Sequence, residues 1–411
     1  MLNKLWLSFF VTAFVAACYQ WLFLSDFDVF NRIVNSLFSM SQLSVEIAIG
    51  LIGVLAFWSG ILKLAELSGL AEKLARIMAP LFAKLMPEVP KGHPALGYVT
   101  MNMASNMLGL DNAATPVGLK AMQSLQRLNP VKDTASNAQI LFLVLNTSSV
   151  TIFPVTIIMY RLQQGATSPA EVFLPILLAT LCSTLAGLLA VSVVQKLNLL
   201  NRVVAFYGLV VGALVALGVY WLSALQSEEM AQVSSALGNG LLFTTIIVIL
   251  IAAYRKGVEI YDGFVDGAKE GFEIAVKIIP FMVAMLTAIG ALRASGILGG
   301  IVSAMSWLME AVGLDPRFVE ALPTALMRPF SASGSRAMML ETMSTHGVDS
   351  FVAKIAAVMQ GSTETTFYVL TVYFGAVGIK KVRHAIGCGL FADLTGIVMA
   401  ILVSYWFFSQ G

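Results

Sequence analysis

Long apolar segments recur along the whole chain and constrain its fold more than any other feature. A helix needs about 20 apolar residues to cross the hydrocarbon core of a bilayer. Segments that meet or approach this length lie at 5–24, 45–64, 138–160, 171–195, 203–223, 239–254, 272–292, 355–378 and 385–408. Because lipid offers no partner to backbone N–H and C=O groups, such segments must be helical. We therefore predict an all-α polytopic membrane protein with about nine transmembrane helices.

Composition agrees with this class and excludes others. Apolar residues make up 58% of the chain and charged residues 12%, whereas soluble domains carry roughly 25% charged residues. No basic tract with interleaved aromatic residues is present, so we expect the lipid bilayer and no nucleic acid as a partner. Cys18, Cys182 and Cys388 lie far apart in apolar segments and form no metal-ligand pattern, which favours simple packing roles.

The charges of the loops predict the orientation. When the N-terminus is placed in the cytoplasm, most of the 25 Lys and Arg residues fall on the cytoplasmic side. The expected outer loops at 25–31 and 224–238 carry acidic residues and no Lys or Arg. Nine spans then place the C-terminus outside. Val15-Ala-Ala-Cys18 also resembles a bacterial lipobox, but the apolar run continues beyond it, so a plain transmembrane helix is favoured over lipidation of Cys18.

Two polar signatures interrupt the apolar segments 138–160 and 355–378. They read Asn146-Thr-Ser-Ser149 and Gln360-Gly-Ser-Thr-Glu364-Thr365. A buried polar group without a partner costs several kcal/mol, so such clusters should line a cavity or bind a ligand. Ser and Thr side chains compete for backbone hydrogen bonds, and we predict that each signature breaks its helix.

Two further stretches, 93–128 and 318–346, are too polar to cross the membrane simply, and we interpret each as a re-entrant hairpin. In the first, Asp111 or Asn112 can cap a helix, either to close the hairpin alone or to present its N-terminus to a polar ligand. In the second, Arg328 and Arg336 need partners at membrane depth. Glu364, Asp393 and Glu341 are the candidates, and a structural pair and a substrate contact are both left open.

The two halves of the chain repeat each other. Ser68-Gly69 matches Ser295-Gly296, and Asn146 matches Gln360. Counting spans gives the two copies opposite orientations, the inverted-repeat pattern of alternating-access transporters. The predicted organisation is an N-terminal transmembrane helix and outer loop (1–44), a first repeat (45–165), connecting transmembrane helices (166–264) and a second repeat (265–411).

The residues expected to bind a solute share polarity and a place in a signature or a hairpin: Asn112, Thr115, Asn146, Ser148, Ser149, Arg328, Ser331, Ser333, Gln360, Ser362, Thr363 and Glu364. Glu364 is the favoured ion-coupling residue because Val150 occupies the matching site in the first signature. Asp393 and Asp111 are the other ion-coupling candidates. No nucleophile–base pair, P-loop or HExxH motif occurs, so we expect no catalytic residues, no cofactor and no metal site.

Several motifs resemble a known family. Residues 112–122 and the Asn146 signature resemble spore maturation protein A. Residues 328–334, 360–369, 373–375 and 389–393 resemble spore maturation protein B. Both belong to the nucleoside recognition, or gate-domain, group of membrane proteins. The resemblance implies a natural fusion of the two in the cytoplasmic membrane of a bacterium, with a nucleoside-like ligand. The chain has no GTPase domain, unlike the similar gate of ferrous-iron transporter B.

Together these features predict a transporter or gate for a small polar solute, with proton or sodium as the coupling ion and a homo-oligomer as a further assembly. The alternative is a non-transporting membrane scaffold of the spore maturation type. Residues 67–87 are amphipathic and basic, which suits a helix on the cytoplasmic surface. The scaffold would depend on this helix, whereas the transporter would depend on the polar signatures.

Overall fold

The computed structural model describes residues 2–108, 111–148 and 150–409, and of residues 2, 3, 5 and 111–113 the backbone alone. Apart from one isolated bridge between Thr134 and Lys381, all regular structure in these residues is helical. The α-helices are α1 (Leu2–Phe23), α2 (Val29–Ser68), α3 (Leu70–Leu85), α4 (Pro94–Met107), α5 (Asp111–Leu128), α6 (Asn137–Thr147), α7 (Val155–Gln163), α8 (Phe173–Gln195), α9 (Arg202–Leu222), α10 (Ser227–Arg255), α11 (Ile260–Ala294), α12 (Ile297–Ala311), α13 (Leu322–Met327), α14 (Ala332–His346), α15 (Phe351–Gly361), α16 (Thr366–Gly375) and α17 (Ala385–Phe408). Two short 3-10 helices are η1 (Pro169–Val172) and η2 (Pro316–Ala321).

Seven helices in the described residues are long and apolar enough to cross a membrane: α1, α2, α8, α9, α10, α11 and α17. This confirms a multi-pass, all-helical membrane protein. The other two predicted spans are divided helices. α6 and α7 are separated by residues 148–154, and α15 and α16 by residues 362–365. Cys18 lies within α1 and is half-buried.

Three helices begin earlier than hydropathy predicted. α2 starts at Val29 instead of 45, α10 at Ser227 instead of 239, and α11 at Ile260 instead of 272. Residues 29–44, which were not expected to be part of the helix, are therefore helical throughout. Hydropathy marks only the apolar part of a helix, and this stretch contains no Gly or Pro to end it. The predicted amphipathic helix at 67–87 is present as α3.

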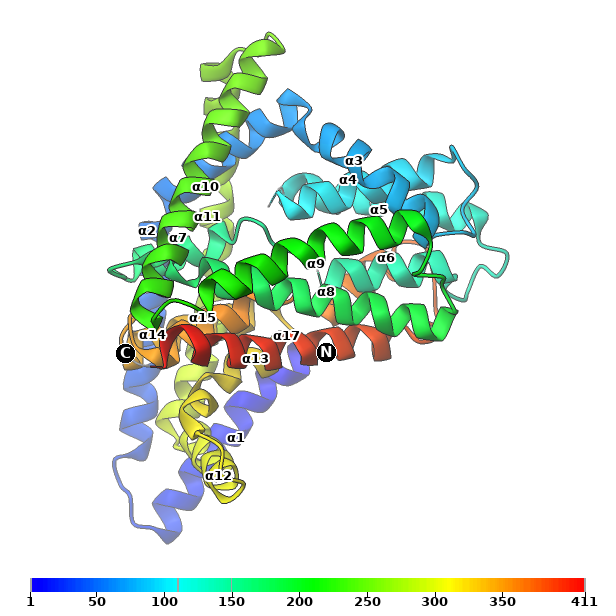
Figure 1. Ribbon diagram of the computed structural model, residues 1–411. Coiled ribbons are helices and arrows are strands. Elements are labelled where there is room, and N and C mark those ends of the chain that lie inside the picture. The colour runs from blue at the N-terminus through cyan, green and yellow to red at the C-terminus, as the bar shows by residue number, and fades with distance from the viewer. Residues whose placement is uncertain (1, 109–110, 149, 410–411) are drawn as a thin grey trace.

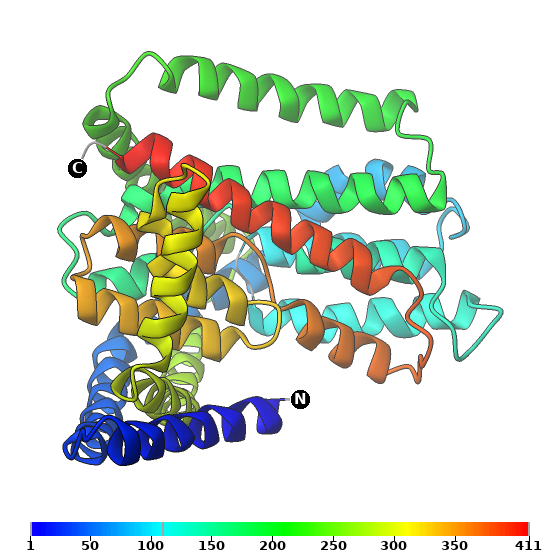
Figure 2. The same cartoon turned by 90° about the horizontal axis from the view of Figure 1, so that it is seen from below.

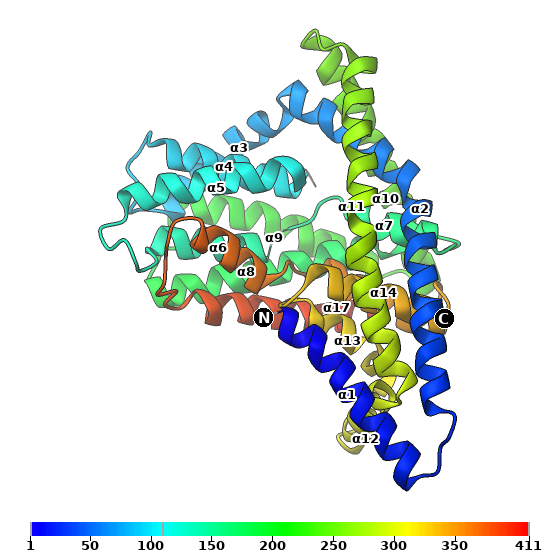
Figure 3. The same cartoon turned by 180° about the vertical axis from the view of Figure 1, so that it is seen from behind.

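α2 and α11 form a long antiparallel pair (Figures 1 and 3). Glycines allow their backbones to approach closely. A Cβ added at Gly271 would lie 2.5 Å from the Leu55 carbonyl oxygen, and one added at Gly267 would lie 2.6 Å from the Ser59 carbonyl oxygen. Near the other end of α11, a Cβ at Gly290 would meet Ser36 on α2. Small residues at such contacts drive helix association where no hydrophobic effect operates between helices.

A second group of helices runs across this pair (Figure 1). α8 and α17 lie side by side in it (Figure 2), where the Ser183 hydroxyl donates to the Ala392 carbonyl at 2.9 Å. Both also pack against the short helices α6 and α15. The divided helices therefore have packed helices beside them, which position the two breaks in the interior.

The order of elements is repeated in the two halves. α2 and α3 correspond to α11 and α12, and the joints are Gly69 and Gly296, both left-handed, with φ of 72° and 77°. The pair α4 and α5 corresponds to α13 and α14. The divided helix α6–α7 corresponds to α15–α16, and Ser136 and Ser350 cap the starts of α6 and α15. η1 and α8–α10 connect the two halves.

Candidate functional site

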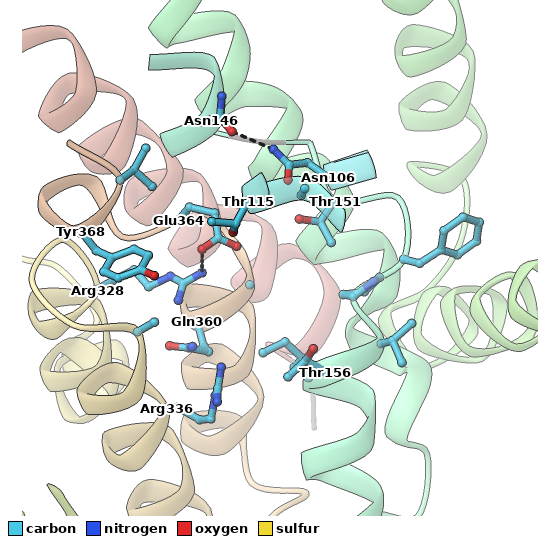
Figure 4. Close-up of a pocket in the computed structure, with 18 of the residues that line it drawn as sticks. Asn106, Thr115, Asn146, Thr151, Thr156, Arg328, Arg336, Gln360, Glu364 and Tyr368 are labelled. Carbon is cyan, nitrogen blue, oxygen red and sulfur yellow. Dashed lines mark hydrogen bonds and ion pairs between the residues drawn. The ribbon is translucent and has the colours of Figure 1, made fainter. Parts of the chain in front are cut away.

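A cavity of about 260 Å³ lies between the two divided helices. Side chains from both halves line it (Figure 4). The first half contributes Asn106 from α4, Thr115 from α5 and Asn146 from α6. The second contributes Arg328, together with Arg336 from α14, Gln360 from α15, and Glu364 and Tyr368 from the break and α16.

The two breaks meet directly. The Glu364 backbone N–H donates to the Thr147 carbonyl at 2.7 Å, so the end of α6 is joined to the segment between α15 and α16. The hydroxyls of Thr147 and Ser148 donate back to the Val144 carbonyl, both at 2.9 Å, and that of Ser362 to the Met359 carbonyl at 2.8 Å. The same carbonyls also accept from backbone N–H groups, Val144 from Ser148 at 3.1 Å and Met359 from Ser362 at 3.3 Å, so the hydroxyls add a second bond at the end of each helix. Both helices end at their signature, as predicted.

An amide pair forms the wall from the first half. The Asn106 amide donates to the Asn146 side-chain oxygen at 2.9 Å, and the Asn146 amide donates to the Phe142 carbonyl at 2.8 Å. Both side chains are thereby fixed in orientation at the cavity. Fixed amides can offer a donor or an acceptor to a polar solute without reorganising.

Arg328 belongs to the wall from the second half and is buried. Its guanidinium donates to the Thr363 carbonyl, from Nε at 2.7 Å and also from a terminal nitrogen. The same group lies 3.4 Å from the Glu364 carboxylate, whose side chain is 48% exposed. Of the three acids considered for this arginine, Glu364 is therefore its partner. Glu341 pairs with Arg293 instead.

Gln360 and Ser335 join α15 to α14. The Ser335 hydroxyl contacts the Gln360 side-chain oxygen, and it also lies 2.6 Å from the Thr324 carbonyl. All three residues are buried. This contact holds the Gln360 side chain at the cavity wall, and it ties the second hairpin to the second signature.

Arg336 has a different environment from Arg328. Its guanidinium carbon lies 5.3 Å from the centre of the Tyr160 ring, and its buried Nε has no hydrogen-bond partner in the described part of the chain. The structure gives it no ion pair with a described acid either. A partly buried guanidinium with an unpaired Nε favours an acceptor supplied from the cavity.

Five of the predicted binding residues line the cavity: Thr115, Asn146, Arg328, Gln360 and Glu364. Others serve the local structure. Ser331 caps α14 by accepting from the Gly334 N–H at 3.0 Å, and its hydroxyl lies 3.2 Å from that of Ser333. Ser148 and Ser362 bond to their own helices, and Thr363 offers its carbonyl to Arg328. The side chains of Asp111 and Asn112, and all of Ser149, lie outside the described residues. Every binding role stays a prediction.

Arg336, Tyr368 and Asn106 also line the cavity but were not among the predicted binding residues. Arg336 follows Arg328 by eight residues and Tyr368 follows Glu364 by four, but non-helical residues lie between the members of each pair, so helical spacing could not have found them. Asn106 contributes through its contact with Asn146, for which sequence spacing carries no signal.

Comparison with known proteins gives the family. The model of the family described as Gate, nucleoside recognition, matches residues 48–163 and 275–380, which together cover more than half of the chain. The chain belongs to this family. The two matched segments contain the two divided helices and the cavity residues from both halves. No solved structure matches the chain.

Two relatives from Bacillus subtilis (strain 168) are similar to different halves of the chain. Spore maturation protein B is 47% identical over 155 residues, which are 38% of this chain and 85% of that protein. Spore maturation protein A is 36% identical over 189 residues, which are 46% of this chain and 93% of that protein. This arrangement agrees with the predicted fusion.

Proposed function

We propose that this protein is a transporter or gate for a small polar solute in the cytoplasmic membrane of a bacterium. The observation that carries the proposal is the cavity between two divided helices, with polar walls from both repeats. Broken helices that meet inside a membrane protein supply binding groups and can be rearranged by a movement of one repeat against the other.

The antiparallel directions of α2 and α11 support inverted repeats, and the order and lengths of the helices support nine passes. α2 and α11 are matching elements of the two repeats, and they run antiparallel. Seven long helices and two divided ones give nine crossings when each divided helix counts as one and each of the hairpins α4–α5 and α13–α14 returns to its own side. We place the N-terminus in the cytoplasm and the C-terminus outside, in accord with the charges of the loops.

The cavity supports a solute of nucleoside-like size and polarity. Fixed amides of Asn106 and Asn146 offer hydrogen bonds, Tyr368 and Tyr373 offer aromatic faces, and Arg336 offers a cation. Such a mixture of aromatic and polar groups is typical of small-molecule sites. We propose no catalytic role, because these residues provide no nucleophile beside a general base.

The first experiment is thermal unfolding of the purified protein against nucleosides, purines, dicarboxylates and amino acids. A ligand at 100 times its dissociation constant stabilises a protein by about 2.7 kcal/mol. We expect one class to stabilise the wild type and to lose its effect in Asn146→Ala and Gln360→Ala. The matched control is Asn239→Ala, an exposed amide on α10.

A different outcome would favour the scaffold. If no compound shifts the unfolding temperature, and the two cavity variants remain folded and functional in cells, the transport proposal fails. The scaffold then predicts loss of function from Lys73→Ala with Arg76→Ala, since both are exposed basic residues on α3.

A further inference from the structure

Asp393 is a buried acid that the cavity does not use. It lies on α17 and is 2% exposed. One carboxylate oxygen accepts from the Thr366 hydroxyl at 2.6 Å, while the other, Oδ1, has no hydrogen-bond partner among the described residues. A buried carboxylate oxygen without a partner is costly, and intramembrane acids usually mark an ion or proton site.

Two more buried oxygens without partners come from the facing break. The hydroxyls of Thr363 and Thr365 make no hydrogen bond with the described part of the chain, and these residues are 2% and 1% exposed. Thr366, which follows them, is the residue bonded to Asp393. Three of the buried oxygens that have no partner in the described residues therefore lie on this one short segment and on the helix beside it.

This segment packs against two glycines of α17, one on either side of Asp393. A Cβ added at Gly389 would lie 3.0 Å from the Thr366 methyl carbon, one turn before Asp393. A Cβ added at Gly396, nearly one turn after it, would lie 2.5 Å from the Thr363 methyl carbon and 3.1 Å from the Ser362 carbonyl oxygen. The break therefore lies against the surface of α17 that carries Asp393.

We propose that Asp393 and the hydroxyls of Thr363, Thr365 and Thr366 bind a sodium ion between α17 and the break. Hard cations take oxygen ligands, and one carboxylate with neutral hydroxyls balances a single positive charge. Mg²⁺ is usually held through one or two carboxylates plus several waters, whereas this buried site offers a single carboxylate and neutral hydroxyls. The inference rests on the proposed function in one respect, because it takes binding of this ion to be coupled to binding of the solute.

The position of the site provides the coupling. The Thr363 carbonyl accepts from Arg328 at the cavity, and the Glu364 N–H donates to Thr147 at the other break. The Thr363 hydroxyl, in contrast, belongs to the proposed ion site. An ion that orders residues 363–366 would therefore also order two contacts of the solute cavity, and each ligand would favour binding of the other.

Sodium binding is tested on the purified full chain without solute. The unfolding temperature is measured as sodium replaces choline at constant ionic strength and fixed pH. For the wild type we expect a saturable rise of roughly 2 °C. Asp393→Asn should abolish the rise. Thr363→Val keeps the methyl group against Gly396 and should raise the half-saturating sodium concentration about tenfold.

Glu364→Gln is the matched control, because its carboxylate lies in the cavity beside Arg328. It should keep the sodium response of the wild type, and loss of the response in this variant alone would assign the ion to Glu364 and overturn the proposal. Should Asp393→Asn fail to fold, Thr363→Val decides, and an unchanged half-saturation would overturn the site. A response to pH with none to sodium would make Asp393 a proton site and would also overturn it.

The outcome is separable from that of the transport proposal. Solute binding without a sodium response removes the ion site and leaves the solute cavity. A sodium response that Asp393→Asn abolishes supports the ion site even when no tested solute binds.

Discussion

Arg328 and Arg336 show how two arginines on one hairpin acquire different properties. Arg328 donates to the Thr363 carbonyl and pairs with Glu364, so its charge is compensated inside the protein. Arg336 has the face of Tyr160 beside it and an Nε with no partner among the described residues. A cation–π contact compensates desolvation only partly. Arg336 is therefore the better group to bind an acceptor on a solute.

Arg336→Gln should weaken solute binding by about 10- to 100-fold, because a hydrogen bond to a charged group contributes about 1.5–3 kcal/mol. Isothermal titration with the solute identified in the thermal screen measures this change. Arg317→Gln is a suitable control, since Arg317 also stacks on aromatic rings, those of Phe351 and Tyr405, away from the cavity. Equal losses in both variants would contradict a binding role for Arg336.

At the scale of elements, the α2–α11 pair depends on close backbone contact. Gly271→Ala places a methyl group 2.5 Å from the Leu55 carbonyl, which cannot move without displacing the helix. We expect a loss of about 1–3 kcal/mol in the free energy of unfolding. Gly299→Ala on α12 is the control, because nothing lies within 4 Å of the added Cβ and Ala favours a helix. Similar stabilities for the two variants would exclude tight packing at Gly271.

A buried ion network joins α7 to the segment before α15. Arg161 is 0% exposed, lies 2.5 Å from Glu171 and 3.4 Å from Asp349, and donates to the Val348 carbonyl at 3.1 Å. Lys354 adds a contact of 3.0 Å with Glu171. The network therefore ties the first repeat to the second.

Arg161→Ala should destabilise the protein by up to about 3–5 kcal/mol, because it removes a fully buried cation and leaves the buried Glu171 carboxylate with Lys354 alone. Chemical unfolding in detergent measures the change. Arg161→Lys keeps the charge but loses the fork of donors, so an intermediate loss is expected. An exposed ion pair contributes at most about 1 kcal/mol to the free energy of unfolding. A loss smaller than this in Arg161→Ala would therefore contradict a stabilising role for the buried network.

At the scale of the whole molecule, a second junction between the repeats is formed by two loops that lie far apart in the sequence, the one before α6 and the one before α17. The backbone N–H groups of Lys380 and Lys381 donate to the Asp133 carbonyl at 2.8 and 2.9 Å, and the Ala135 N–H donates to the Lys381 carbonyl at 3.0 Å. The Asp133 carboxylate accepts from the Thr134 hydroxyl at 2.8 Å and lies 3.5 Å from the Lys381 ammonium. These two groups, the hydroxyl first, lower the pKa of Asp133 below its usual range.

This lowered pKa predicts how stability depends on pH. An acid with a lowered folded pKa stabilises the protein above its unfolded pKa of about 3.9, and the contribution is lost as pH falls through the folded pKa. The unfolding temperature should therefore decrease from about pH 5 to pH 3, and less steeply in Asp133→Asn. Thr134→Val, which removes the hydroxyl alone, should be intermediate. Identical slopes in all three proteins would show that this junction is not linked to proton binding.

The amino-acid sequence by itself determined the class of the protein, its two repeats and the position of both breaks. Hydropathy, the joints at Gly69 and Gly296, and the two polar signatures are local properties. The effects of these local properties on the backbone do not depend on where the segment lies in the folded protein. The helix starts were misjudged because a helix continues through polar residues until a breaker or a cap ends it.

Only the tertiary structure decided which polar groups meet. It assigned Glu364, among three acids, to Arg328, separated the capping serines from the cavity residues, and left Asp393 facing the second break. The contacts of Glu364 and Asp393 depend on how α15, α16 and α17 pack, since they join residues that are 36 and 27 positions apart along the chain. Sequence spacing within one helix carries no information about such contacts, because they are set by the side chains at the interfaces between helices.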